Sequence, residues 1–159
     1  MGVVNATFAF NPDGQLLASG SADQTVKLWQ VSSGQETSAF VGHAHAITAV
    51  TFSPNGQMLA SCGGWDGTIR LWDIASGQEI LKLAGYSELI YTVVFNPDGQ
   101  TLVSSSSDEI IRLWDINSGM QTQMFIGHIG GASTIAFSPD GRMFASGGWD
   151  GAIKLWYCD

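Results

Sequence analysis

A histidine, a serine and an aspartate recur together in this chain, and these side chains are the three groups of a hydrolytic triad. The two sets are His43, Ser61 and Asp66, followed by His128, Ser146 and Asp150. In a triad the aspartate orients the histidine, which removes the proton from the serine nucleophile. A catalytic set occurs once in an enzyme, whereas this one occurs twice at nearly the same spacing. The repetition favours a structural role, and a hydrolase is the less favoured alternative.

Repeats extend over the whole chain of 159 residues, which has the length of one domain. Prolines and tryptophans recur every 42 or 43 residues. They are Pro12, Pro54, Pro97 and Pro139, and Trp29, Trp72, Trp114 and Trp156. Each proline lies in a Phe-Asn/Ser-Pro-Asp/Asn-Gly segment, and each of these tryptophans follows a basic residue and a leucine. We therefore divide the single domain, 1–159, into four copies of one unit, with approximate boundaries 1–42, 43–85, 86–127 and 128–159.

Each unit consists of short apolar runs separated by turn residues, which predicts an all-β fold without a convincing helix. In the second unit we expect four strands, at residues 46–52, 57–62, 68–73 and 78–83. Pro54 and Gly56 mark the first turn, because proline fixes φ and glycine accepts a positive φ. Trp65, Asp66 and Gly67 mark the second turn. A unit of about 42 residues is too small to cover its own apolar faces, so the units must stack on one another.

The chain resembles the WD-repeat β-propeller family over essentially its whole length. The resemblance rests on Gly-His pairs at 42–43 and 127–128, on the proline turns, on Leu-Ala-Ser stretches, on the turn aspartates and on Leu-Trp-Asp at 71–73 and 113–115. It implies β-propeller blades of four antiparallel strands, with four blades per chain. The fourth unit stops within its third strand, so we expect the last blade to lack its outer strand.

The resemblance also implies a structural role for the recurring polar residues. In this family a hydrogen-bonded tetrad runs from the turn aspartate through histidine and serine to the indole N–H of the tryptophan. The complete tetrads are His43, Ser61, Asp66 and Trp72, and His128, Ser146, Asp150 and Trp156. The incomplete sets are Ser19, Asp23 and Trp29, and Ser104, Asp108 and Trp114. Tyr86 stands at the histidine position of the third unit and Met1 at that of the first, so the third unit is expected to form a different network.

Two further tryptophans, Trp65 and Trp149, each precede a turn aspartate, where the other two units carry small residues. Tight turns are usually exposed and polar, so a large aromatic side chain there is unexpected. These side chains either contact a partner or pack against an adjacent blade, and the sequence leaves both alternatives open. The repeat alignment places Trp65, Trp149, His45 and Glu88 on one rim, where we expect them to bind a protein or peptide partner.

The composition disfavours several other functions. Six basic residues against 14 acidic ones give a net charge of −8, which opposes binding to nucleic acid or to an acidic membrane surface. No glycine-rich phosphate loop leads into a helix, and His43 and His45 have no third ligand nearby. We therefore expect no cofactor, no metal and no catalytic residue. Two cysteines are too few for a disulfide framework, which favours a reducing compartment and a cytoplasmic location.

Four blades make about half of a propeller ring, because WD-repeat rings generally need more than four. We expect two chains to associate head to tail into a homodimeric, eight-bladed ring. Alternatively, the chain is a piece of a longer repeat protein. The favoured function is a non-enzymatic scaffold that mediates protein–protein interaction, and the alternative is a self-assembling repeat without a separate ligand.

Overall fold

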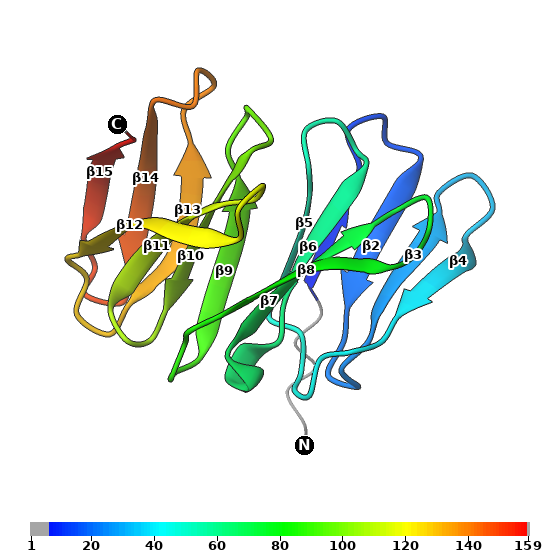
Figure 1. Ribbon diagram of the computed structural model, residues 1–159, viewed down its shortest axis with the longest axis horizontal. Coiled ribbons are helices and arrows are strands. Elements are labelled where there is room, and N and C mark those ends of the chain that lie inside the picture. The colour runs from blue at the N-terminus through cyan, green and yellow to red at the C-terminus, as the bar shows by residue number, and fades with distance from the viewer. Residues whose placement is uncertain (1–6, 159) are drawn as a thin grey trace.

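The computed structural model describes residues 7–158, which form fifteen β-strands in four antiparallel sheets (Figure 1). The first two sheets contain β1 (Thr7–Phe10), β2 (Leu16–Gly20), β3 (Val26–Gln30) and β4 (Gln35–Phe40), and β5 (Ala49–Phe52), β6 (Met58–Cys62), β7 (Thr68–Asp73) and β8 (Glu79–Ala84). The other two contain β9 (Ile90–Phe95), β10 (Thr101–Ser106), β11 (Ile110–Asp115) and β12 (Met120–Ile126), and β13 (Ala132–Phe137), β14 (Met143–Gly148) and β15 (Ile153–Tyr157). The predicted all-β blades are confirmed, and the fourth sheet has three strands. Among residues 7–158 we find no helix with the length and the apolar composition of a membrane span.

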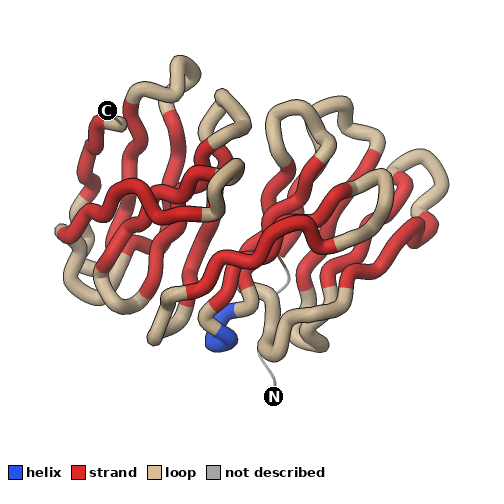
Figure 2. Tube along the Cα trace, in the orientation of Figure 1, coloured by secondary structure: helices blue, strands red, loops and turns tan. Residues whose placement is uncertain are grey.

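The sheets stand side by side, from β1–β4 on the right of Figure 1 to β13–β15 on the left. Strands follow chain order within each sheet, and the innermost strands β1, β5, β9 and β13 contact one another in sequence. Loops therefore gather at the two opposite ends of the strands (Figure 2). We call the lower end in this view the lower rim; it carries the turns between second and third strands and the connections from one sheet to the next.

The strands predicted for the second unit differ from the observed ones mainly at their ends. The third strand, predicted at 68–73, is β7; the second begins one residue later than predicted, and the fourth begins and ends one residue later. The first begins three residues later than predicted, because the Ile47 N–H donates to the carbonyl of Ser21, in the turn that follows β2 of the preceding sheet. The turn that contains Trp65 is a short 3₁₀ helix, η1 (Gly64–Asp66), which the sequence did not predict.

Apolar side chains from facing sheets form three cores, one at each junction between neighbouring sheets. At the second junction Ile69 and Leu71 of β7 pack with Val93 and Phe95 of β9, and none of the four is more than 8% exposed. The second and third sheets are therefore covered on both faces. Each of these two sheets contributes side chains of alternating direction to the two junctions that it borders.

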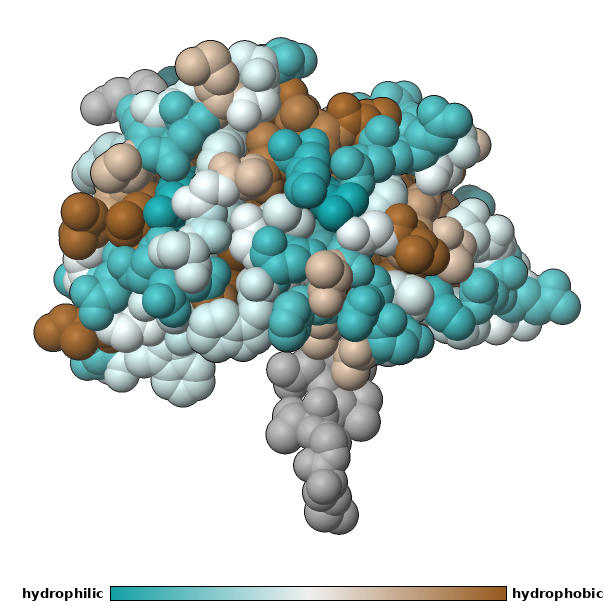
Figure 3. All heavy atoms as spheres, turned by 60° about the horizontal axis from the view of Figure 1, so that its bottom comes forward, coloured by the Kyte–Doolittle hydropathy of each residue, from teal (hydrophilic) through white to brown (hydrophobic). Residues whose placement is uncertain are grey.

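The outward faces of the first and fourth sheets carry the same kinds of residue without this cover. Phe10 of β1 is 59% exposed, whereas Phe95, its equivalent in the third sheet, is 8% exposed. Leu155 of β15 is 66% exposed, whereas its equivalent Leu71 is fully buried. Figure 3 accordingly shows hydrophobic residues at its left margin, on the side of β13–β15. The two end faces thus resemble the two sides of an interior junction.

Candidate functional site

The structure brings each histidine, serine and aspartate set to the indole of a tryptophan in the same sheet. In the second sheet the His43 imidazole lies between Asp66 and Ser61, with Nδ1 2.7 Å from Oδ2 and Nε2 2.8 Å from Oγ. The Trp72 indole N–H donates to the same Ser61 Oγ at 2.8 Å. The fourth sheet repeats this arrangement at 2.7–2.9 Å with His128, Ser146, Asp150 and Trp156. Four side chains therefore form one continuous network in each of these sheets.

The hydrogen bonds of this network run in one direction. An indole N–H only donates, so Ser61 Oγ accepts it; when Nδ1 of the neutral His43 imidazole carries its hydrogen toward the carboxylate, Nε2 accepts the hydrogen bond of the Ser61 hydroxyl. The Nδ1–H group of His43 then donates to the Asp66 carboxylate. Ser61 is fully buried, and Ser146 of the fourth sheet is 1% exposed. A catalytic nucleophile must reach its substrate, whereas this hydroxyl is enclosed by the network.

Two glycines make room for the contact between histidine and aspartate. A Cβ atom at Gly63 would overlap the His43 imidazole and the Asp66 carboxylate, and one at Gly148 would overlap their counterparts in the fourth sheet. In the third sheet, which lacks the histidine, Ser106 occupies the position of Gly148. Gly63 has a φ of −93°, so the close approach of these side chains, rather than an unusual backbone angle, requires glycine here.

In the third sheet Tyr86 replaces the histidine, and its hydroxyl bonds to the serine and to the tryptophan of the same sheet. Its hydroxyl accepts the Trp114 indole N–H at 2.8 Å and forms a hydrogen bond with Ser104 Oγ. Burial raises the pKa of the Tyr86 phenol well above its usual value, so the hydroxyl keeps its proton. The network ends at this hydroxyl and does not reach Asp108, so it differs from the tetrads as the tyrosine predicts.

An arginine binds the aspartate that has no histidine partner. Arg112 lies 2.7 Å from Asp108, and its guanidinium is 4.7 Å from the centre of the Tyr86 ring. In the first two sheets the equivalent basic residue pairs with a glutamate of the outer strand, in the pairs Lys27–Glu36 and Arg70–Glu79. Gln121 occupies the glutamate position in the third sheet. Replacement of the histidine is therefore accompanied by a new partner for the arginine and an uncharged outer strand.

The first sheet contains a shorter network. Trp29 Nε1 donates to Ser19 Oγ at 2.8 Å, whereas Asp23 accepts the N–H and the hydroxyl of Thr25. Met1, which aligns with the histidine position, lies outside the described residues. The described part of this sheet thus joins serine to tryptophan but leaves the turn aspartate separate.

The tetrads hold their aspartates ionised far below neutral pH. Burial opposes the ionisation of Asp66, but hydrogen bonds from His43 and Thr68 outweigh it and lower the pKa to about 2. The hydrogen bond from His128 is the main reason why the pKa of Asp150 is also lowered to about 2. Both carboxylates therefore stabilise the folded state above about pH 4 and lose that contribution as the pH falls toward 2.

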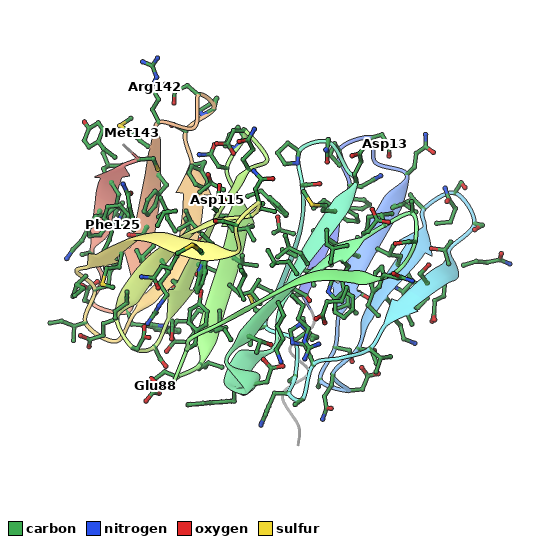
Figure 4. All side chains as sticks on the ribbon, viewed as in Figure 1. Asp13, Glu88, Asp115, Phe125, Arg142 and Met143 are labelled. Atoms are coloured by element: carbon green, nitrogen blue, oxygen red, sulfur yellow. The ribbon has the colours of Figure 1, made fainter. Side chains whose placement is uncertain are left out.

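The four residues expected to bind a partner lie on the lower rim but do not form one pocket. Trp65 and Trp149 are 59% and 68% exposed and belong to the second and fourth sheets. His45 and Glu88 are exposed in the connections that lead into β5 and β9. Figure 4 shows Glu88 at the lower rim and Asp13 at the opposite one. The third sheet separates the two tryptophans, so the rim offers two distinct aromatic positions.

The two tryptophans differ in their surroundings. The Trp149 ring lies 6.2 Å from that of Tyr91 in β9, at an interplanar angle of 58°. Trp149 thus contacts the adjacent sheet and is exposed as well, so the two alternatives for its role are compatible. Among the described residues no other aromatic ring packs against Trp65.

Two rim residues near Trp149, Tyr91 and Glu109, were missed by the sequence analysis. Comparison of the repeats would have indicated both, because each differs in type from the residues at the equivalent positions. Tyr91 stands where the second and fourth sheets carry threonine and serine, and Glu109 stands where both carry glycine. Glu109 nevertheless adopts a φ of 69°, a conformation that favours glycine.

A polar recess of about 410 Å³ lies between the third and fourth sheets on the rim opposite the tryptophans, and its lining includes Asp98 and Asp115. These carboxylates already accept backbone N–H groups of their own turns, at 2.7 Å in both cases. Within residues 7–158 no group of three or more His, Cys, Asp or Glu side chains is arranged to hold a metal ion. The lower rim is therefore the candidate functional surface.

A family model of the WD domain, G-beta repeat, matches residues 4–30, 34–73, 77–115 and 119–157. The chain belongs to the WD-repeat family. It is 43% identical over 53 residues to pre-mRNA-processing factor 19 homolog 2 of Arabidopsis thaliana, a match covering 33% of this chain and 10% of that relative. It is 47% identical over 51 residues to protein tipD of Dictyostelium discoideum, covering 32% and 8%. A match to the Lissencephaly-1 homolog of Dictyostelium discoideum has 40% identity over 47 residues and covers 30% and 11%. The matched segments thus span about a tenth of these relatives.

The WD repeats are offset from the sheets. The match at 34–73 begins just before β4 of the first sheet and ends with β7 of the second. The matches at 77–115 and 119–157 begin just before β8 and β12 in the same way. Each WD repeat after the first therefore contributes the outer strand of one sheet and the three inner strands of the next.

We predict that His43→Ala and His128→Ala each lower the free energy of unfolding by about 1–3 kcal/mol, because the buried serine and the aspartate lose a hydrogen-bond partner. Urea or thermal denaturation measures the change. His45→Ala is the matched control, since this histidine is exposed and its loss should change stability by less than about 0.5 kcal/mol. Loss of an ester-hydrolysing activity in His43→Ala, with stability unchanged, would instead support the hydrolase.

The lowered pKa values predict a pH dependence of stability. The folded-state pKa of Asp66 and Asp150 is about 2, below the ordinary value of 3.8, so stability should fall as the pH decreases through this window. Melting temperatures measured between about pH 2 and pH 5 test this. Asp66→Asn should flatten the curve, whereas Asp13→Asn on the opposite rim should not. An equal slope in Asp66→Asn and wild type would show that the tetrad does not control it.

Proposed function

We propose that this WD-repeat chain is a non-enzymatic scaffold that binds a protein or peptide partner through its lower rim. The observation that carries the proposal is the exposure of Trp65 and Trp149 on that rim. Tryptophan is enriched among the few residues that dominate the binding energy of protein interfaces. Loops held by rigid sheets are a common position for such residues. His45 and Glu88 extend the proposed surface on either side of the second sheet's turn.

Charge and burial support the other parts of the proposal. The net charge of −8 favours a basic partner, through faster association that weakens with salt, and disfavours nucleic acid and acidic membranes. The burial of Ser61 and Ser146 leaves neither His-Ser-Asp set with an exposed nucleophile, which supports a non-enzymatic role. Cys62 is buried and forms no disulfide, which fits a reducing compartment such as the cytoplasm.

The double variant Trp65→Ala/Trp149→Ala should lose partners that wild type retains in affinity capture, with affinity falling at least about 30-fold if both residues are anchors. Val31→Ala is the control, because Val31 is 46% exposed in a turn on the opposite rim. Circular dichroism checks that the double variant is folded. Unfolding of this variant, or capture of the same partners as wild type, would refute the rim as the binding surface.

We further propose that two chains associate head to tail through their end faces and complete an eight-bladed ring. Phe8 and Phe10 on one face and Ile153 and Leu155 on the other are 59–81% exposed. Their equivalents pack against each other at every interior junction, so the two faces are complementary in kind. Apolar patches of this type mark association surfaces. The alternative is a repeat whose property is self-assembly without a separate ligand.

Sedimentation equilibrium tests this association. Wild type should show a species of twice the chain mass of 16.9 kDa, and Leu155→Asp should shift the equilibrium to the single chain because it buries a charge in the joint. Lys82→Asp, which changes an exposed residue of the outer strand β8, is the matched control and should remain dimeric. A wild-type chain that sediments only as a monomer would rule out the ring. If the chain forms a dimer and the double tryptophan variant loses no captured partner relative to wild type, self-assembly without a separate ligand is favoured.

A further inference from the structure

We propose that the corner of the lower rim between the third and fourth sheets binds a single cationic side chain, an arginine or a lysine, of the partner. The corner consists of Trp149, Tyr91 and Glu109. The proposal rests on the proposed function, because it names the chemical group that one part of the rim recognises. It does not depend on ring formation.

Two aromatic rings supply the first part of the corner. The ring centres of Trp149 and Tyr91 are 6.2 Å apart and the rings are inclined at 58°, so the two rings are tilted and do not stack flat on each other. A cation is attracted to the face of an aromatic ring, most strongly to that of tryptophan. Trp149 remains 68% exposed, so its ring is accessible from solvent.

The backbone fixes this ring pair in place. The Trp149 N–H donates to the carbonyl of Gly131 at 3.2 Å. A Cβ atom at Gly131 would lie 2.9 Å from Cε2 of Tyr91, so the tyrosine ring packs directly on this glycine. The two aromatic residues therefore border the same short loop, which runs from β12 to β13.

A carboxylate completes the corner. Oε1 of Glu109 accepts the N–H of Gly130 at 2.9 Å, and a methyl group at Gly130 would lie 3.5 Å from Cβ of Trp149. The charge is thus held beside the tryptophan by the same loop. None of the ion pairs within residues 7–158 includes Glu109, so the described residues offer this carboxylate no basic partner. A ligand cation would find both its counter-ion and an aromatic surface here.

The conformation of Glu109 is a second sign that this position serves a ligand. Its φ is 69°, and the equivalent turn positions in the second and fourth sheets are Gly67 and Gly151. A non-glycine residue in this region is strained. The fold therefore does not need a glutamate here, and glycine would fit the backbone better.

The corner is specific to Trp149. The equivalent tryptophan is Trp65 of the second sheet, and in the preceding first sheet Gln24 stands at the position of Glu109. No second ring within residues 7–158 packs against Trp65. Trp65 is thus a matched control within the same chain, since it shares the exposure and the turn position but lacks the carboxylate.

The test titrates the full chain with the capped peptide Gly-Gly-Arg-Gly-Gly, its lysine analogue and its neutral glutamine analogue, using ¹H–¹⁵N NMR. The arginine and lysine peptides should shift the Trp149 indole and Gly130 amide signals, and added salt should weaken this binding. Trp149→Ala and Glu109→Gly should each reduce the affinity at least fivefold, whereas Trp65→Ala should not change it. Glu109→Gly should also raise the melting temperature, because glycine removes the backbone strain of the positive φ at this position. The same substitution removes the carboxylate charge.

Equal shifts with the glutamine peptide would overturn the proposal. So would arginine affinity that Trp149→Ala or Glu109→Gly leaves unchanged. The scaffold proposal fails separately: it falls if the double tryptophan variant keeps its captured partners. If that variant loses them while Glu109→Gly retains them and the arginine peptide does not bind, the scaffold stands and the cation site falls.

Discussion

Each sheet of this protein is apolar on both faces, and a sheet of three or four strands has no means of covering either face by itself. Ile69 and Leu71 become fully buried only because the next sheet places Val93 and Phe95 against them. The three cores are therefore properties of pairs of sheets. Stability in such an array is the sum of joints between neighbours, as in other repeat proteins. The exposed rim loops depend on these joints for their rigidity.

The same close packing creates an electrostatic requirement at each junction. The third strand carries a tryptophan whose indole N–H must be satisfied where little water reaches. The second and fourth sheets satisfy it through serine, histidine and aspartate, and the third through serine and Tyr86. The tyrosine cannot extend the network, so Arg112 neutralises the aspartate instead. A tyrosine in place of a histidine in one connecting loop thus goes together with a different carboxylate partner for the basic residue of the third strand, Asp108 in place of an outer-strand glutamate.

The repeat period made the sheets predictable, since prolines, glycines and tryptophans recur at nearly constant spacing. Strand β7 agrees with its prediction residue for residue, because both of its ends are set by local turn residues. The start of β5 was wrong because a contact with the preceding sheet decides it. The role of single residues that depart from the repeat, such as Tyr91 and Glu109, could not be inferred from the sequence. It depends on which residues of the neighbouring sheet they contact. The sequence left open whether Trp65 and Trp149 contact a partner or pack against an adjacent sheet, and it did not indicate that the two side chains have different neighbours.

The offset between WD repeat and sheet affects how such a chain can change its length. Removal of residues 77–115 would take away β8, β9, β10 and β11 and connect β7 to β12. Strand β12 could then pair with β7 as β8 does now. Every remaining sheet would keep its number of strands. Duplication of the same segment would insert one further sheet in the same way. The segment that genetic rearrangement can copy or delete without loss is therefore the WD repeat and not the sheet. Because each repeat joins the outer strand of one sheet to the inner strands of the next, an array can gain or lose repeats without leaving an incomplete blade in its interior.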